Sequence, residues 1–308
     1  MKRKETMPSH HGVDETLEKD YPNETLKLLN QRASCRSFSA KKIPRKVLEL
    51  ALEAGIHSPS GGNLQPYSII KIEEAKTSEK LARLCGNQVW IAQAPTNLLF
   101  CIDWHRLKRW AEVEVAPFTA TSSFRHFWIS FQDTIIAAQN ICTALDSLGL
   151  GSVYIGTVLD CFRELKSMLR LPEGVFPVVL LSLGYPKARP RPKRKLGIEV
   201  IVHNEKYQQF NDKMLKQAFE KKYPDLKVEI TQERLEKISE VCRRVHEEGF
   251  AQKCTKRIKE HGYINPVQRY FGLHYAADMM PLDNDEFLRI MEEFGFSWFK
   301  KYQPVEYL

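Results

Sequence analysis

Hydrophobic residues recur every three or four positions in three segments of the chain. This spacing predicts amphipathic helices over residues 24–34, 44–58 and 126–151. The second segment opens with Pro44, and proline is favoured at the start of a helix because its missing N–H would have no partner there. The third segment has few charges along its length, so we expect it to be buried nearly all round, as at a subunit interface.

Three further segments have the length and composition of β-strands. Residues 96–103 and 175–185 are continuous apolar runs, which are typical of central strands covered on both faces. Residues 67–72, rich in β-branched side chains, are the third candidate. Helices alternate with these strands along the chain, which predicts an α+β or α/β fold.

The pattern changes after residue 205. Residues 206–308 carry many charges at helical spacing, and residues 227–230 (KVEI) are their only short strand candidate. Residues 1–22 are basic and lack the apolar core of a secretory signal. We therefore expect a flexible N-terminal arm over 1–22, a folded domain over 23–205 and a mostly helical C-terminal extension over 206–308.

The composition is that of a well-packed globular protein with a basic balance. Of the 308 residues 43% are hydrophobic, and 46 Lys and Arg against 38 Asp and Glu give a net charge of +8. This charge favours anionic partners such as nucleic acid, a membrane surface or a phosphorylated cofactor. No apolar run reaches about 18 residues, so no membrane span is expected. The basic run at 187–195 has no aromatic residues between its charges, which disfavours single-stranded nucleic acid.

Seven cysteines stand at positions 35, 85, 101, 142, 161, 242 and 254, and no two of them form a CxxC pair. Several lie inside apolar runs, as small buried hydrophobic residues of a reducing compartment do. We therefore expect a cytoplasmic protein. No pair has the spacing of metal ligands, which disfavours a metal or iron–sulfur site.

Arg32, Ser34 and Arg36 occupy alternate positions of the segment QRASCRSF. In extended backbone, side chains two residues apart point to the same side, so two guanidinium groups and a hydroxyl would converge. Such a group suits a phosphate, which arginine can bind through two parallel hydrogen bonds. Taken alone, the segment could equally be an exposed basic turn.

The loop HSPSGGNLQP follows the second predicted helix and carries two glycines among polar side chains. Gly61 and Gly62 allow the backbone to approach a ligand closely. Ser60, Asn63 and Gln65 supply hydrogen-bond donors and acceptors. The loop suits a planar, heteroatom-rich ring better than a metal ion, although loops of this composition are also common as plain turns.

A third motif, GLGSVYIGTV at residues 149–158, predicts a helix end, a short strand and then Gly156. Because Gly156 has no side chain, its backbone N–H could face a ligand directly. The alternative is an ordinary turn from helix to strand. The basic run 187–195 follows later in the chain, and its prolines hold it extended.

Taken in this order, the four motifs resemble the nitroreductase-like family of FMN-dependent oxidoreductases, over roughly residues 24–207. The resemblance implies an α+β fold of the nitroreductase type, with a central mixed sheet flanked by helices. It also implies a homodimer that binds FMN at its interface. The extension is not part of the minimal family pattern. It could wrap the other subunit, cover the active site or bind a partner, and of these we expect wrapping.

The resemblance assigns the phosphate and ribityl chain of FMN to basic and small residues. Arg32, Ala33, Ser34 and Arg36 would contact them from the first motif. Arg194, in the late basic run, matches the residue that grips the phosphate.

The flavin ring would be contacted by two other motifs. From the glycine-rich loop, the resemblance implies that Pro59, Ser60 and Gly61 reach the flavin from the partner subunit. Asn63 and Gln65 of the same loop would lie near the ring. From the third motif, Tyr154, Ile155 and Gly156 would line the ring.

The implied activity is a ping-pong reduction in which NAD(P)H is the electron donor and nitroaromatics, quinones or similar small molecules are the acceptors. No catalytic side chain is predicted, because the flavin N5 would carry the chemistry. Two alternatives are reductive dehalogenation or flavin fragmentation on the same fold, and a non-enzymatic basic protein that binds nucleic acid.

Residues 104–126 are expected to cover the substrate site. Their aromatic residues could stack on an acceptor or pack a dimer core. Arg106, Lys108 and Arg109 could attract a phosphate of NADPH or form a solvated helix face.

Overall fold

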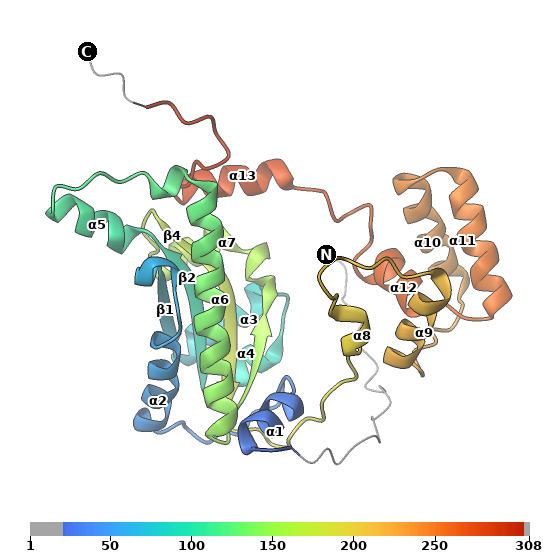
Figure 1. The fold of residues 1–308 in the computed structure, drawn as a ribbon, viewed down its shortest axis with the longest axis horizontal. Coiled ribbons are helices and arrows are strands. Elements are labelled where there is room, and N and C mark those ends of the chain that lie inside the picture. The colour runs from blue at the N-terminus through green and yellow to red at the C-terminus, as the bar shows by residue number, and fades with distance from the viewer. Residues whose placement is uncertain (1–20, 305–308) are drawn as a thin grey trace. The chain divides into compact units, whose positions relative to one another are not determined.

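The computed structural model describes residues 21–304, which fall into two compact units (Figure 1). We call residues 21–192 together with 285–304 the sheet unit, and residues 193–284 the helical unit. The flexible arm expected over residues 1–22 lies almost wholly outside the described residues.

The sheet unit is built on four strands: β1 (Tyr67–Ile72), β2 (Thr96–Asp103), β3 (Gly151–Ile155) and β4 (Val175–Gly184). Their order is β1-β2-β4-β3, and each neighbouring pair is antiparallel. The α+β class is confirmed, but the sheet is antiparallel throughout the described residues, not mixed as expected. The strands β2 and β3 do run parallel, but β4 lies between them.

Both long apolar runs become strands that are buried at every residue, β2 and β4, as their composition predicted. Helices surround the sheet: α1 (Glu24–Gln31), α2 (Arg45–Ile56), α3 (Ala75–Leu84), α4 (Val89–Gln93), α5 (His105–Val113), α6 (Phe124–Ser147), α7 (Phe162–Leu169) and α13 (Asn284–Glu293). Figure 1 shows α6 running along the sheet as its longest covering helix.

Helix α6 begins at Ser123, whose hydroxyl accepts the backbone N–H of His126. It packs against α2 so closely that a Cβ added to Gly55 would lie 2.4 Å from the Ile141 side chain. Its other side was expected to be buried as well, but Trp128 and Phe131 there are 51% and 38% exposed. Within a single chain, α6 is covered on the side that packs against the sheet and α2, and its opposite side remains exposed.

The end of the described chain belongs to the core of the sheet unit. Phe294 and Phe296, which follow α13, are buried and meet Phe176 of β4 with ring centroids 5.1 and 6.1 Å away. The backbone N–H of Gly174 donates to the Phe294 carbonyl at 2.8 Å. Residues 285–304 thus pack with the strands although the helical unit separates them in sequence.

The helical unit contains α8 (Ile198–Ile201), α9 (Asp212–Lys222), α10 (Gln232–Val245), α11 (Glu248–His261), α12 (Pro266–Arg269) and a π-helical turn, Tyr270–His274. Its small core is formed by Leu235, Ile238, Ile258 and Ile264. The candidate strand KVEI contributes one isolated bridge, Val228 to Ile264. Across the described part of the chain, no helix is long and apolar enough to span a membrane.

Candidate functional site

The first motif lies in extended backbone along the free edge of the sheet, beside β3. The N–H of Cys35 donates to the Ser152 carbonyl at 2.9 Å, and Phe38 forms a bridge with Pro186. Cys35 and Phe38 are buried, and Arg36 is exposed. The buried side chains of Cys35 and Phe38 are three positions apart, and Arg32 and Ser34 are half-buried, so the strict alternation expected from the sequence is not seen.

Arg32 lies where the first and third motifs meet. Its Cζ is 5.9 Å from the centre of the Tyr154 ring, and its Nε donates to Sγ of Cys142 at 3.2 Å. The same Nε is 3.5 Å from a carboxylate oxygen of Asp146. Two motifs more than a hundred residues apart in sequence thus form one surface, because β3 lies at the sheet edge to which the first motif is attached.

Asp146 joins a second guanidinium to this cluster. Arg189 Nη1 lies 4.0 Å from its other carboxylate oxygen and donates to the Leu150 carbonyl at 3.4 Å. Burial raises the pKa of Asp146, while the charges of Arg32 and Arg189 oppose that rise. Two guanidinium groups share one carboxylate here, so the cluster retains positive charge that suits an anion.

Sequence reasoning did not single out Asp146 or Arg189. A signal for Arg189 existed, since it belongs to the basic run 187–195, but only the fold selects it from that run. Arg36 has a different neighbour: its Cζ lies 5.7 Å from the centre of the Trp90 ring of α4.

The glycine-rich loop is hydrogen-bonded to α6. The N–H of Gly61 donates to both carboxylate oxygens of Asp133, at 3.1 and 3.0 Å. A Cβ added to Gly61 would lie 2.7 Å from the Ile129 side chain, so the loop approaches the helix as closely as glycine allows. Burial raises the pKa of Asp133, and the Gly61 N–H opposes that rise.

The same loop is also tied at its far end. The Gln65 side-chain amide donates to the Ile56 carbonyl at 2.9 Å, and its N–H donates to the Ser60 hydroxyl at 3.2 Å. Arg106 of α5 donates to the carbonyls of Gln65 and Tyr67, at 2.7 and 3.0 Å. Arg106 thus has a structural partner, which the sequence interpretation did not foresee.

Three residues of this loop have left-handed backbone: Gly62, Asn63 and Gln65, with φ of 59°, 54° and 48°. Two of them carry side chains, and that conformation is unfavourable for such residues. Strained loops held by surrounding contacts are typical of ligand-binding sites. Pro59, Gly61 and Asn63 are exposed, so this loop presents its backbone and side chains to the surface.

The third motif lies on β3 and the turn that follows it, and its Tyr154 is the residue that neighbours Arg32. Tyr154 is half-buried, with its hydroxyl 3.4 Å from Oε1 of Gln139, and Ile155 is buried. Burial raises the pKa of Tyr154, so the phenol stays neutral. A Cβ added to Gly156 would find no atom within 4 Å, so no side chain covers its backbone on that side.

The turn that follows, Gly156–Asp160, is braced from α4. The Gln88 side-chain amide donates to the Thr157 hydroxyl at 2.7 Å, and that hydroxyl donates to the Cys85 carbonyl at 3.0 Å. The open position at Gly156 therefore belongs to a well-supported turn.

Ala33 and Ser34 lie between the two arginines and are half-buried. Arg194 is part of the helical unit, and its contact with the same phosphate stays a prediction.

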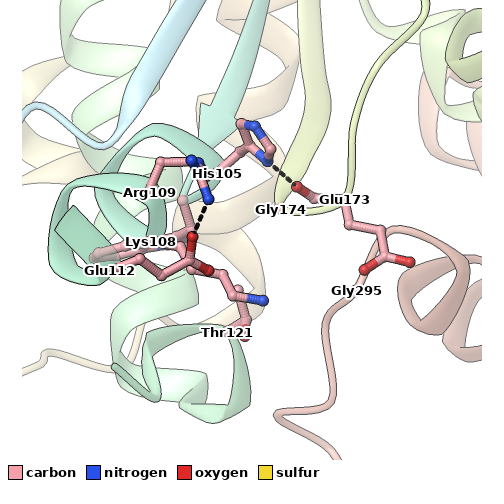
Figure 2. A pocket seen from close by; sticks show the side chains of 9 residues that line it. His105, Lys108, Arg109, Glu112, Thr121, Glu173, Gly174 and Gly295 are labelled. Atoms are coloured by element: carbon pink, nitrogen blue, oxygen red, sulfur yellow. Dashed lines mark hydrogen bonds and ion pairs between the residues drawn. The ribbon is translucent and has the colours of Figure 1, made fainter. Parts of the chain in front are cut away.

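A pocket of about 200 Å³ opens at the start of α5 (Figure 2). His105 Nδ1 lies 3.1 Å from the Glu173 carbonyl, and Arg109 is paired with Glu112 within the helix. Lys108 also lines the pocket, so basic and acidic groups are balanced there. A second pocket, of about 660 Å³, lies between α2 and the β1 end of the sheet. Neither pocket includes a residue assigned to FMN.

Comparison with known proteins identifies the family. A model of the nitroreductase family matches residues 29–185, which include the first three motifs. The chain is 34% identical over 186 residues to "FMN reductase [NAD(P)H]" of Bacillus subtilis, covering 60% of this chain and 75% of the relative. It is 32% identical over 191 residues to "Oxygen-insensitive NADPH nitroreductase" of Salmonella typhimurium, covering 62% and 78%.

The fold has solved counterparts. The structure of NfrA2 from B. megaterium superposes with a TM-score of 0.68 at 26% identity, over 91% of this chain and all of that one. Since the family model spans the strands, the basic segment, the glycine-rich loop and the turn at Gly156, the chain belongs to the nitroreductase family.

Proposed function

We propose that the protein is an FMN-dependent oxidoreductase that takes electrons from NAD(P)H and passes them to nitroaromatics, quinones or similar small acceptors in a ping-pong cycle. The names of the relatives, FMN reductase, NADPH nitroreductase and NADPH-flavin oxidoreductase, support the donor and the cofactor. They do not favour dehalogenation, flavin fragmentation or nucleic-acid binding. The observation that carries the proposal is the cluster of Arg32 and Arg189 around Asp146, directly beside Tyr154 and the open position at Gly156.

The phosphate end of FMN would be held by the basic edge of the sheet unit. Arg32 would donate to the phosphate from a guanidinium already oriented by Asp146, and Ser34 would add a hydroxyl from the same side. Arg36, farther along the same extended segment, would also contact the phosphate. Arg194 would reach the phosphate from the helical unit. The cluster carries two guanidinium groups and one carboxylate, so its net positive charge would offset part of the negative charge of the phosphate.

The ring of FMN, when bound, supplies the hydride chemistry. The chain would position it with backbone and uncharged groups. Gly156 offers an N–H with no side chain in the way, Ile155 is buried behind it, and Tyr154 presents a neutral phenol. Asn63 and Gln65 would meet the ring edge from a loop that Asp133 and Arg106 hold in place.

We also propose that the protein is a homodimer built on α6. Phe124, Trp128, Phe131 and Ile136 leave an apolar face of this helix exposed, which supports an interface with a second copy. Because Asp133 ties the loop to α6, an interface on this helix would bring Pro59, Ser60 and Gly61 next to the partner's site.

Two further expectations belong to this proposal. All seven cysteines are free thiols, which supports a cytoplasmic location. The part of the extension that lies in the helical unit, residues 206–284, is proposed to contact the second subunit, and the exposed aromatic residues Tyr270, Phe271 and Tyr275 support this role.

The decisive experiment is an anaerobic half-reaction. Purified protein incubated with FMN should retain it and turn yellow, and NADH or NADPH should then bleach the flavin absorbance. An acceptor panel would follow, with nitroaromatics and quinones restoring the absorbance. Folded protein that takes up no FMN from excess would contradict the proposal.

A further inference from the structure

The side chain of Gln88 joins the corner between α3 and α4 to the turn that follows β3. Gln88 caps the N-terminus of α4, yet its side chain makes no capping hydrogen bond to that helix. Its amide nitrogen donates instead to the Thr157 hydroxyl at 2.7 Å and to the Cys85 carbonyl at 2.8 Å. The first of these bonds connects residues 69 positions apart in the chain.

These groups form a closed set of hydrogen bonds. The Thr157 hydroxyl accepts from the Gln88 amide and donates to the Cys85 carbonyl at 3.0 Å. Both amide hydrogens of Gln88 and the hydroxyl hydrogen of Thr157 therefore have acceptors. Rotating either side chain would break two hydrogen bonds, so the set favours one arrangement. We call the Gln88 and Thr157 side chains and the Cys85 carbonyl the Gln88 clamp.

Both sides of the Gln88 clamp are fixed by the core of the sheet unit. The Gln88 N–H donates to the Ala82 carbonyl at 3.1 Å, and the Gln88 carbonyl accepts the N–H of Ile91 at 3.0 Å. Ala82 and Ile91 are buried, and so is Val158, which follows Thr157. Neither partner of the clamp can move without disturbing buried side chains.

The Gln88 clamp ends one residue from Gly156. Thr157 holds the peptide that follows this glycine, and the buried Ile155 holds the one that precedes it. Glycine has more backbone freedom than any other residue, so the direction of the Gly156 backbone groups depends on these two neighbours. The clamp thus sets the orientation of the backbone proposed to meet the flavin.

The same corner contacts the first motif as well. Two residues after Gln88, the centre of the Trp90 ring lies 5.7 Å from Cζ of Arg36. One short segment therefore contacts both the turn proposed to meet the flavin ring and an arginine proposed to meet the phosphate.

We propose that Gln88 and Thr157 are positioning residues that orient Gly156 toward the ring of FMN and thereby control electron transfer more than FMN affinity. This inference rests on the proposed function. Small displacements of a reacting group lower the rate strongly, so loss of the clamp should slow flavin reduction. Affinity should be retained, because Arg32 and Arg189, proposed to hold the phosphate, contact Asp146 and belong to a different set of interactions.

Two substitutions at Thr157 separate its hydroxyl from its shape. Thr157→Val keeps the branched shape and removes the hydroxyl, whereas Thr157→Ser keeps the hydroxyl. In full-length protein loaded with FMN, we expect Thr157→Val to slow anaerobic reduction by NADH or NADPH about three- to tenfold, the effect of one lost neutral hydrogen bond. Thr157→Ser should be reduced at the wild-type rate, and both variants should keep the wild-type Kd for FMN.

Two further measurements do not depend on turnover. The midpoint potential of bound FMN should shift in Thr157→Val and return to the wild-type value in Thr157→Ser, because protein groups beside a flavin tune its potential. In protein without FMN, hydrogen exchange in the peptide that contains residues 156–160 should be faster in Thr157→Val than in wild type.

Gln88→Leu tests the other side of the clamp. It removes both donated hydrogen bonds and should slow reduction as Thr157→Val does. The double variant should be no slower than Gln88→Leu alone, because both changes disrupt the same set of hydrogen bonds. Additive losses would contradict the clamp.

Thr77→Val is the matched control. Thr77 lies at the opposite end of α3 from Cys85, and its hydroxyl donates to the Glu74 carboxylate at 2.5 Å. This variant should keep the wild-type rate and potential.

Three outcomes would overturn the inference. A folded Thr157→Val protein with wild-type reduction and potential would do so and leave the proposed function intact. So would a lower melting temperature with unchanged rate and potential, since that result indicates a structural role alone. A wild-type protein that takes up no FMN would overturn the proposed function and this inference together.

Discussion

Both carboxylate oxygens of Asp133 accept the backbone N–H of Gly61, at 3.1 and 3.0 Å. A buried acid in the middle of α6 thus holds the loop that the sequence marks as the ring-binding segment. Because this contact joins the loop to the proposed dimer helix, we expect a substitution in either element to change FMN binding.

Replacing Asp133 with alanine should release the loop. A lost hydrogen bond to a buried charged group costs about 1–3 kcal/mol, so we expect FMN to bind about tenfold more weakly. Fluorescence titration would give the Kd, and hydrogen exchange should show faster exchange at Gly61. The matched control is Asp225→Ala, an exposed aspartate of the helical unit. Unchanged exchange at Gly61 would contradict the role of this contact.

Removing single guanidinium groups should rank their contributions to FMN binding. Arg32→Ala should weaken binding about thirtyfold, the effect of losing a charge-assisted contact of about 2 kcal/mol. Arg189→Ala should weaken it less, because that side chain is more exposed. Arg194→Ala tests the predicted contact from the helical unit, and Arg191→Ala, in the same basic run, is the control. Equal Kd values for all four variants would speak against this phosphate site.

Two glycine substitutions separate packing from ligand binding. Gly156→Ala should leave the melting temperature unchanged, because the added methyl group meets no atom within 4 Å, yet it should slow flavin reduction by NAD(P)H. Gly55→Ala should lower the free energy of unfolding by about 1–3 kcal/mol, because its methyl group would overlap Ile141. Thermal unfolding and stopped-flow reduction measure the two effects. A Gly156→Ala protein with normal reduction would argue against a ring at this position.

A charge placed on the exposed face of α6 should disrupt the proposed dimer. Trp128→Glu and Phe131→Glu should shift the sedimentation mass from two chains to one and lower flavin content. Val113→Glu, at a 70% exposed position of α5, should change neither quantity. Circular dichroism would establish that the variants remain folded. A folded Trp128→Glu protein that sediments as a flavin-loaded dimer would exclude this interface.

Asp146 should give stability a pH dependence of defined sign. Its folded pKa is raised above the unfolded value of 3.8, so the folded state binds more protons between these two values. Stability therefore falls as pH rises through this window, and the penalty is complete above the folded pKa. The difference in unfolding free energy between wild type and Asp146→Asn, measured in urea from acid to neutral pH, should show this slope. A difference that is flat or rises with pH would contradict the assignment.

Local patterns in the sequence were sufficient to predict most elements. The largely apolar runs became the central strands β2 and β4, which are buried at every residue, because a run dominated by apolar residues is covered on both faces of the sheet. The expected convergence of Arg32 and Arg36 stays a prediction, since Arg32 contacts Cys142 and Asp146 whereas Arg36 lies over the Trp90 ring. The antiparallel pairing was not predictable in this way, because it depends on β4 entering between β2 and β3.

The sequence by itself determined the alternation of helices and strands and the helical character of the extension, because propensity and periodicity act over a few residues. Its resemblance to a known family supplied the α+β class and the motifs expected to meet FMN. Only the tertiary structure decided that Asp146 gathers Arg32 and Arg189, that Asp133 and Arg106 hold the glycine-rich loop, and that Phe294 packs beside β4. Those contacts join residues far apart in the chain. No local pattern specifies them, since each arises from burying shared surface once the sheet has formed.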